Sequence, residues 1–404
     1  MIGSEKRLLK KHVVLLGAGA SVEAGLLPST KLTEKIYTDF AHNQRHDQKF
    51  TRLLAYIISR LKLRNSRRGE SPYDPIDVEE LFDAMNGIIR RDAFVISEFV
   101  ERWDAFLDDV GSGEEIKNLE SILKNIVRSV VNDAAARGRG GFGSFDLSRN
   151  VRSLADLIRP NHKVHMDERQ LRTFLQPFFS VLVQNLTIKD GSSDYLGPLV
   201  TSPDVSLVAT LNYDLGVELC CQSFGRPYDY GLDRWALQKR VDWKQSDGVR
   251  LLKLHGSLNW VGTEEDIKVK DSEIRPSERR IMIFGGGGNK LSADGPFLQF
   301  LYRFERALFN SGSLLVVGYS FRDAHINAIL QRWRLTRRIT RLTVIDPSPP
   351  PLWRLGFHDG EVKRRVGNRE TTLKMHLRTL PCGAAEGIRS FFQEEDLFAH
   401  APAN

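Results

Sequence analysis

The chain has 404 residues, of which 41% are apolar and 27% charged, a composition typical of a globular protein with two to three domains. Its net charge is +7, and no run of 18 apolar residues occurs, which excludes a membrane-spanning helix. Three cysteines without a C-x-x-C pair exclude a disulfide framework and a cysteine zinc site.

The first apolar run does not resemble an export signal. It follows the basic "KRLLKK" but is broken by Gly17 and Gly19 and stopped by Glu23. Together with the few cysteines, this predicts a cytoplasmic protein.

Six short apolar runs have the character of β-strands. They are rich in Val, Ile and Leu and nearly continuous, which is typical of strands buried on both faces of a parallel sheet. These runs occupy residues 13–16, 205–210, 249–254, 280–284, 313–317 and 341–345.

The stretch between the first two strands is predicted to be helical. Apolar residues follow helical spacing over 78–89, 116–131 and 171–183. The predicted fold is therefore α/β, with a Rossmann-like parallel sheet and an inserted helical subdomain. Its sheet domain comprises residues 1–40 and 200–350, and the insertion comprises residues 41–199.

Residues 351–404 are predicted to form a basic C-terminal extension. From position 322 to 378 the chain carries thirteen basic side chains against five acidic ones. Such a stretch is either a solvated basic face or a contact for nucleic acid, an anionic ligand or a partner protein.

A glycine loop follows the first strand, in the sequence "VVLLGAGAS" over 13–21. Gly17 and Gly19 precede a predicted helix, which suits backbone N–H groups that bind a phosphate. The dinucleotide pattern G-x-G-x-x-G fails at Val22, so a standard dehydrogenase is not expected. A plain tight turn is the alternative interpretation.

Polar side chains also follow the second and third strands. Asn212 and Asp214 end "LVATLNYD", and His255 lies in "LLKLHGSLNW". The first two residues also suit a turn, and His255 also suits a core position. Gly256 and Ser257 nevertheless predict a sharp turn that exposes the imidazole, and histidine is the commonest general base.

Two further strand ends carry polar residues. "LLVVGYSFRDAHIN" over 314–327 repeats the strand-then-glycine pattern, with Ser320 and Asp323 placed to start a helix. Asp346 ends the next strand, where a carboxylate can accept from a ribose hydroxyl or an adenine amine. Ligands of open parallel sheets bind at the carboxyl ends of the strands, so these residues indicate a nucleotide site.

The four motifs "GAGAS", "TLNYD", "KLHGSLNW" and "VVGYSFRDAHIN" occur in the order and spacing of the sirtuin superfamily. Within it, the chain resembles the SIR2-like NADase branch of bacterial antiphage defence. The resemblance implies NAD as substrate and assigns roles by position. By this match the NAD-binding residues are Gly17, Ala18, Gly19, Ser21, Gly318, Tyr319 and Ser320, and the catalytic residues are Asn212, His255 and Asp214. Ala20 within the glycine loop and Asp346 at its strand end complete the predicted NAD-binding set.

Sirtuins that deacylate proteins carry a four-cysteine zinc module, which this chain lacks, so no metal site is expected and water becomes the natural acceptor. The resemblance thus implies an NAD hydrolase, the gated effector of an abortive-infection system. It also implies a homo-oligomer and a HerA-type ATPase partner, as in SIR2–HerA systems. The alternatives are a deacylase or ADP-ribosyltransferase, and a non-enzymatic NAD or ADP-ribose sensor that regulates a nucleic-acid-processing partner.

Overall fold

The computed structural model describes residues 11–42, 48–71, 73–89, 168–243, 248–263, 265–270, 274, 278, 280–283, 295–366 and 369–399. The predicted helical stripe over 116–131 lies outside these residues. Within the described part of the chain, no helix is both long enough and apolar enough to cross a lipid bilayer.

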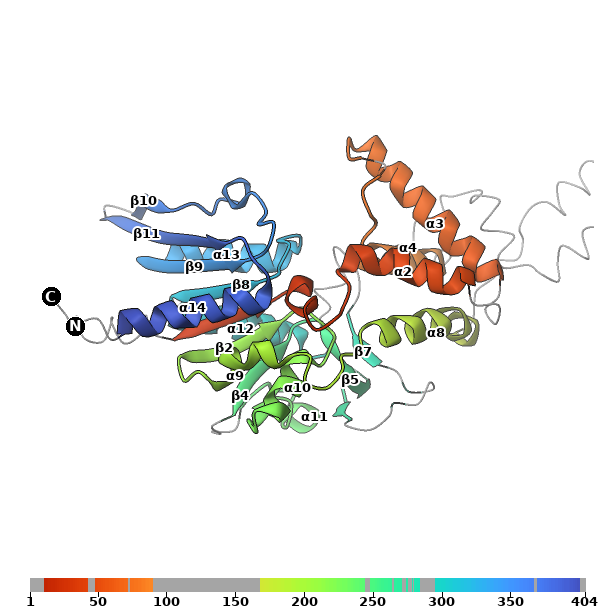
Figure 1. Cartoon of the computed structure of the whole chain (residues 1–404), viewed down its shortest axis with the longest axis horizontal. Coiled ribbons are helices and arrows are strands. Elements are labelled where there is room, and N and C mark those ends of the chain that lie inside the picture. Colours follow the sequence, from red (N-terminus) through yellow and green to blue (C-terminus); the bar gives the residue numbers. More distant parts are fainter. Residues whose placement is uncertain are drawn as a thin grey trace, which may run out of the picture.

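An eight-stranded, mostly parallel sheet forms the centre of the molecule (Figure 1). Its strand order is β10-β11-β9-β8-β1-β2-β4-β3, and only the β10–β11 pair is antiparallel. The strands are β1 (His12–Leu16), β2 (Val205–Thr210), β3 (Tyr228–Asp229), β4 (Val249–Lys253), β8 (Ser313–Val317), β9 (Ile339–Ile345), β10 (Gly360–Val366) and β11 (Arg369–Leu380).

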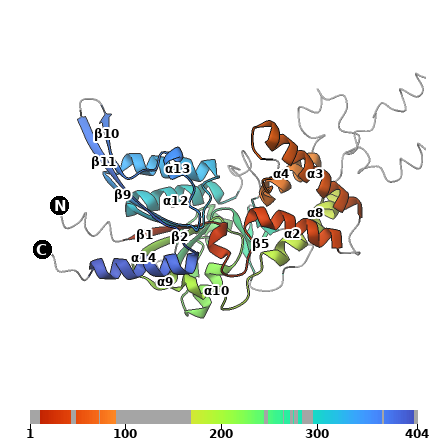
Figure 2. The same cartoon turned by 45° about the horizontal axis from the view of Figure 1, so that its top comes forward.

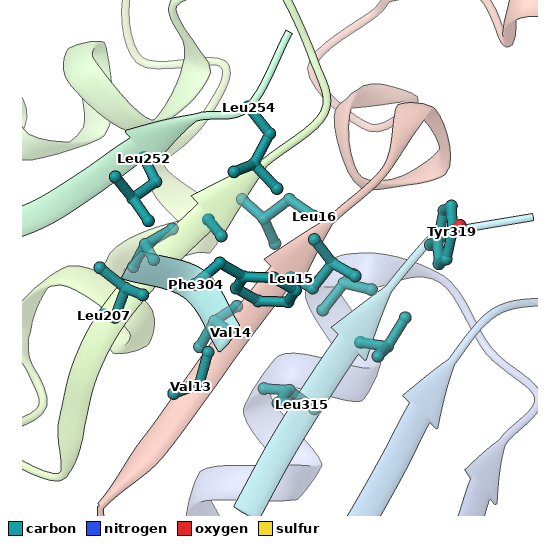
Figure 3. Packing of buried hydrophobic residues seen from close by; sticks show 14 of the residues in the cluster. Val13, Val14, Leu15, Leu16, Leu207, Leu252, Leu254, Phe304, Leu315 and Tyr319 are labelled. Atoms are coloured by element: carbon teal, nitrogen blue, oxygen red, sulfur yellow. The ribbon is translucent and has the colours of Figure 1, made fainter. Parts of the chain in front are cut away.

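Helices cover both faces of this sheet, which explains why its central strands are continuously apolar. Helices α12 (Phe297–Ser311) and α13 (Ala324–Thr336) lie on one face, and α9 (Gly197–Thr201), α10 (Gly216–Ser223) and α14 (Ala384–Ala399) lie on the other (Figure 2). Val13, Val14 and Leu15 are fully buried, and Phe304 of α12 packs over them (Figure 3).

The predicted α/β fold with a parallel sheet is confirmed, but the strand predicted at 280–284 does not belong to that sheet. Strand β7 (Arg280–Met282) pairs instead with β5 (Gly256–Gly262) in a small antiparallel sheet that also contains β6 (Ile267–Val269). Only two residues separate β4 from β5, so the chain turns directly out of the main sheet into this second one.

The remaining long helices form a group with its own core. They are α2 (Ser29–His42), α3 (Gln48–Arg67), α4 (Val78–Ile89) and α8 (Glu168–Asn185), and Figure 1 shows them beyond the carboxyl end of the sheet. The predicted insertion begins at 41, but Leu32, Ile36 and Phe40 already pack into this core. The helical group therefore begins at Ser29, because α2 directs its apolar stripe toward the other helices.

The C-terminal residues also depart from the predicted division of the chain. Strand β11 pairs in parallel with β9, and Met375, Ile388 and Phe391 join the main core. Residues 360–399 thus complete the sheet, whereas the sequence predicted a separate extension over 351–404. The strand lacks a continuous apolar run, because along β11 exposed Lys374 and His376 alternate with buried Leu373 and Met375. The sequence analysis therefore did not predict it.

The three thiols differ in their access to solvent. Cys220 and Cys221 of α10 are fully buried, and burial raises the pKa of each to about 12. Cys382 is half-buried, and burial raises the pKa of its thiol as well. The thiolate is the reactive form, so a raised pKa slows alkylation.

We therefore predict that one thiol of the native protein, Cys382, reacts with a disulfide reagent at pH 8, whereas all three react in guanidinium. A Cys382→Ser variant should lose the native reaction entirely. Rapid modification of two or more thiols before unfolding would contradict the burial of α10.

Candidate active site

The carboxyl ends of β1, β2, β4, β8 and β9 lie at one edge of the sheet because these strands are parallel. From β1 the sheet extends through β2 and β4 on one side and through β8 and β9 on the other. The strand order therefore reverses at β1, where open α/β sheets bind their ligands. All predicted site residues follow these strands, so the structure brings them to one edge.

The glycine loop after β1 makes a backbone contact with the loop after β8. The N–H of Gly17 donates to the Val317 carbonyl and that of Gly19 to the Gly318 carbonyl, both at 2.9 Å. A Cβ atom on Gly17 would lie 2.6 Å from the Gly318 oxygen. The glycines thus allow the two loops to touch, whereas the sequence predicted that their N–H groups bind a phosphate.

The rest of this loop is a short 3-10 helix, η1 (Ala18–Ser21), in which Ala18 is exposed and Ala20 is buried. A hydroxyl network anchors it to the end of β2. Ser21 Oγ donates to Asp214 Oδ2 at 2.8 Å and accepts from Asn212 Nδ2 at 2.9 Å. Asn212 Nδ2 also donates to the Gly17 carbonyl at 2.9 Å.

This network restricts what Asn212 and Asp214 can do. Both hydrogens of Asn212 Nδ2 are engaged by the loop, which leaves Oδ1, an acceptor, for a ligand. Asp214 is 6% exposed, and its Oδ1 accepts from the Gly216 N–H while its Oδ2 accepts from Ser21. Its carboxylate therefore holds the glycine loop, whereas the sequence predicted that it orients the ribose or water.

A buried lysine that the sequence analysis did not identify contacts the same turn. Lys253 of β4 is 1% exposed; its Nζ donates to the Asp214 carbonyl and lies 3.2 Å from Glu218 Oε1. Tyr230 donates its hydroxyl hydrogen to the same Glu218 oxygen at 2.8 Å. The signal in the sequence was the position of this lysine inside the apolar run "LLKLHG", because a buried lysine needs a partner of opposite charge.

His255 is buried, with 4% of its surface exposed, whereas the sequence predicted an exposed ring. Gly256, with φ of +90°, turns the chain into β5, and Ile283 beside β7 donates its N–H to the His255 carbonyl. The small antiparallel sheet thus begins directly after His255 and contacts its backbone. Its Nε2 lies 3.2 Å from Asp323 Oδ2, and its Nδ1 has no hydrogen-bond partner among the described residues.

The loop after β8 contains two residues with a left-handed backbone, and of these only the non-glycine Phe321 is strained. Gly318 and Phe321 adopt φ of +61° and +55°, and Asn327 donates to the Phe321 carbonyl at 2.7 Å. Tyr319 is buried, and its hydroxyl contacts Asn327 Oδ1 and the Asp323 carbonyl. Ser320 is exposed, and the predicted helix start at Asp323 is confirmed, since its carboxylate caps α13.

Asp346 follows β9 and is half-buried. Its Oδ1 accepts from the Ser348 N–H at 2.8 Å, which closes an Asx turn. The turn engages one of the two carboxylate oxygens of Asp346, and its predicted contact with the ligand stays a prediction.

The helical group contributes a carboxylate to this edge. The Tyr213 hydroxyl lies 3.1 Å from Glu79 Oε1 of α4 and 2.6 Å from the Ile283 carbonyl, and its ring centroid is 6.4 Å from that of His255. Burial, and next the charge of Glu79, raise the pKa of Tyr213 well above its usual range. Tyr213 is therefore a neutral donor, and Glu79 and Asp323 make this edge acidic.

Within the described ranges, no group of three or more His, Cys, Asp or Glu side chains is arranged to hold a metal ion.

The contact at Gly318 generates a prediction about stability. A Cβ atom added to Gly318 would lie 2.2 Å from the Ala20 nitrogen. Gly225 has a similar φ of +62°, but a Cβ atom added there would have no atom within 4 Å. Gly225→Ala should cost about 1–2 kcal/mol for the left-handed backbone alone. Gly318→Ala should cost about 1–3 kcal/mol more, because the two loops must separate. Denaturant titrations measure the free energy of unfolding of both variants. Equal losses in the two would show that the loop contact contributes nothing to stability.

Replacing the buried lysine generates a second prediction. Lys253→Met leaves the Glu218 carboxylate buried without its cation, which should destabilise the protein by about 3–5 kcal/mol. Adding Glu218→Gln should recover part of that loss, because it removes the uncompensated charge. Thermal unfolding of both variants measures the effect, and a double variant less stable than Lys253→Met would contradict this account.

Solved structures that are similar to this chain include Sir2 proteins. A mutant Sir2 homologue in complex with ADP ribose is 12% identical, covering 66% of this chain and 87% of that chain with a TM-score of 0.38. Sir2Tm bound to a propionylated peptide is 9% identical, covering 98% and 100% with a TM-score of 0.38. A Sir2 homolog–NAD complex is 12% identical, covering 57% and 76% with a TM-score of 0.35.

No curated protein matches the chain in sequence. A family model does match: residues 206–364 correspond to the SIR2-like domain. This range includes Asn212, His255 and Asp323, but not the glycine loop at 17–21. The region similar to the SIR2-like domain thus contributes most of the strand ends at the candidate active site.

Proposed function

We propose that the protein is an NAD⁺ hydrolase that releases nicotinamide and ADP-ribose. The observation that carries the proposal is a pair of polar atoms, at the switch-point edge of the SIR2-like region, to which no group in the described part of the chain donates a hydrogen. These atoms are Asn212 Oδ1, an acceptor, and His255 Nδ1, a buried ring nitrogen without a partner among the described residues that we assign as an acceptor. Two acceptors beside the acidic Glu79 and Asp323 suit a ligand that brings hydroxyl donors and a positive charge.

The chemistry needs this combination. When the bond between ribose C1′ and the nicotinamide nitrogen breaks, its electron pair passes to the pyridinium, which leaves as neutral nicotinamide. Positive charge then develops on the ribose, as in glycoside hydrolysis, and nearby carboxylates stabilise it. Because the leaving group is already cationic, no general acid is required.

We assign the remaining tasks to Asn212 and His255. Asn212 Oδ1 accepts a hydrogen from the attacking water or a ribose hydroxyl and so fixes its position. His255 takes the proton that water loses as its oxygen bonds to C1′. Gly17–Ser21, the loop from Gly318 to Ser320, and Asp346 line the edge for the rest of the dinucleotide.

The cysteines favour water over a protein acceptor. The chain has three in total, two of them buried in α10. The four-cysteine module of the deacylating sirtuins therefore has no counterpart, and the place of that small domain is taken by helices. This favours hydrolysis over deacylation or ADP-ribosyl transfer.

The resemblance to antiphage NADases also suggests a cellular role for this activity. Uncontrolled NAD hydrolysis would kill the host cell, so we propose a gated cytoplasmic effector that assembles as a homo-oligomer with a HerA-type ATPase. Native mass measurement of the protein, alone and with a co-expressed ATPase, tests this assembly. A monomer in both samples would contradict it.

The central prediction concerns the two acceptors. His255→Ala and Asn212→Ala should each lower nicotinamide release from NAD by at least about 10²-fold, the contribution of a positioned proton acceptor. Chromatography of nicotinamide and ADP-ribose measures the effect. His376→Ala is the matched control, because His376 is exposed on β11.

Turnover retained in both variants would contradict the assignment. ADP-ribose found on protein would support the transferase alternative, and NAD binding without turnover would support the sensor alternative. Because the proposed effector is gated, each assay is repeated with partner ATPase and phage extract.

A further inference from the structure

The Asp323 carboxylate contacts two different parts of the molecule. Its Oδ1 accepts from the N–H groups of His325 and Ile326, at 2.9 and 3.3 Å, and so caps helix α13. Its Oδ2 lies 3.2 Å from His255 Nε2. Both side chains are about nineteen-twentieths buried. The pair joins the loops after β4 and β8, which lie on opposite sides of β1 and β2 in the sheet.

The helix terminus favours an ionised Asp323. Two N–H donors and the positive end of the helix dipole stabilise a carboxylate over a carboxylic acid. An ionised carboxylate only accepts hydrogens, so the Asp323 contact places the single proton of a neutral imidazole on Nε2.

The protonation state of Nδ1, the other ring nitrogen, follows from this. His255 Nδ1 becomes a lone-pair acceptor, and it is buried without a partner among the described residues. A buried acceptor without a donor costs free energy unless a ligand supplies the hydrogen. The unpartnered nitrogen is thus the one left to act on a ligand.

We propose that Asp323 is a positioning residue, which fixes His255 in the Nε2–H tautomer so that Nδ1 is the nitrogen that accepts the substrate-derived proton. This inference rests on the proposed NAD hydrolase activity for its kinetic consequence. Its structural consequence, the tautomer, does not depend on which reaction the protein catalyses.

Asp323→Asn separates this role from simple helix capping. Asparagine caps helices as well as aspartate does. To keep the cap, Asn Oδ1 must still accept from His325, which directs Nδ2 toward the imidazole. The amide then donates to Nε2, and the proton moves to Nδ1. The fold is retained while the tautomer is reversed.

The first experiment measures the tautomer in the full chain at neutral pH. ¹⁵N spectra of histidine-labelled protein distinguish a protonated from an unprotonated ring nitrogen, and the His255 signals are those missing from His255→Gln. We expect Nε2–H in the wild type and Nδ1–H in Asp323→Asn. A wild-type Nδ1–H tautomer would overturn the proposal whether or not any variant folds.

The second experiment measures NAD turnover. Asp323→Asn should lower kcat by about 10²–10⁴-fold, as expected when a catalytic histidine is held in the wrong tautomer, with a KM for NAD within threefold of wild type and an unchanged Tm. Asp359→Asn is the matched control, because that exposed carboxylate accepts the Leu377 N–H at 3.1 Å far along the sheet. Asp323→Ala should lower both kcat and Tm.

The outcomes separate the two proposals. Wild-type kcat in Asp323→Asn, with turnover lost in His255→Ala, would overturn the positioning role and leave the hydrolase intact. A reversed tautomer in a protein that never cleaves NAD would support the positioning role and reject the hydrolase.

Discussion

The contact between the glycine loop and Gly318 is the constraint on which the rest of the site depends. It places backbone against backbone between the ends of β1 and β8, and only residues without a Cβ fit there. It joins the ends of β1 and β8 by direct backbone hydrogen bonds at the point where the strand order reverses. The polar side chains of the neighbouring loops, Asn212, Asp214 and Asp323, then connect the strand ends around this contact.

Buried polar contacts then fix each loop in turn. Lys253 and Ser21 engage Asp214 from two directions, and Asp323 connects His255 to a helix terminus. Each of these groups would be costly to bury alone, so the contacts stabilise one arrangement of the edge over others. The site is thereby organised before a ligand arrives, which is what a reaction that relies on positioning and electrostatics requires.

Sequence reasoning located the strands and the edge but not the contacts between loops. The parallel strands were predictable because burial on both faces demands continuous apolar runs, as at 13–16 and 313–317. Strand β11 was missed because its period-two pattern carries basic side chains. Strand β7 was predicted at 280–284 but assigned to the main sheet, because a short apolar run does not reveal which strand it pairs with. The Asp323 contact with His255 joins residues 68 positions apart through two loops, and no local pattern encodes such an approach.

The two proposed catalytic side chains are not equivalent as probes of the mechanism. Asn212 donates both Nδ2 hydrogens to the glycine loop, so its removal releases Ser21 and Gly17 as well as taking away Oδ1. Loss of activity in Asn212→Ala therefore mixes binding with chemistry. His255 contacts Asp323 through one nitrogen only, and α13 keeps its cap without it, because Asp323 Oδ1 makes that contact. An effect of His255→Ala on kcat with KM preserved is therefore the cleaner measure of proton transfer at this edge.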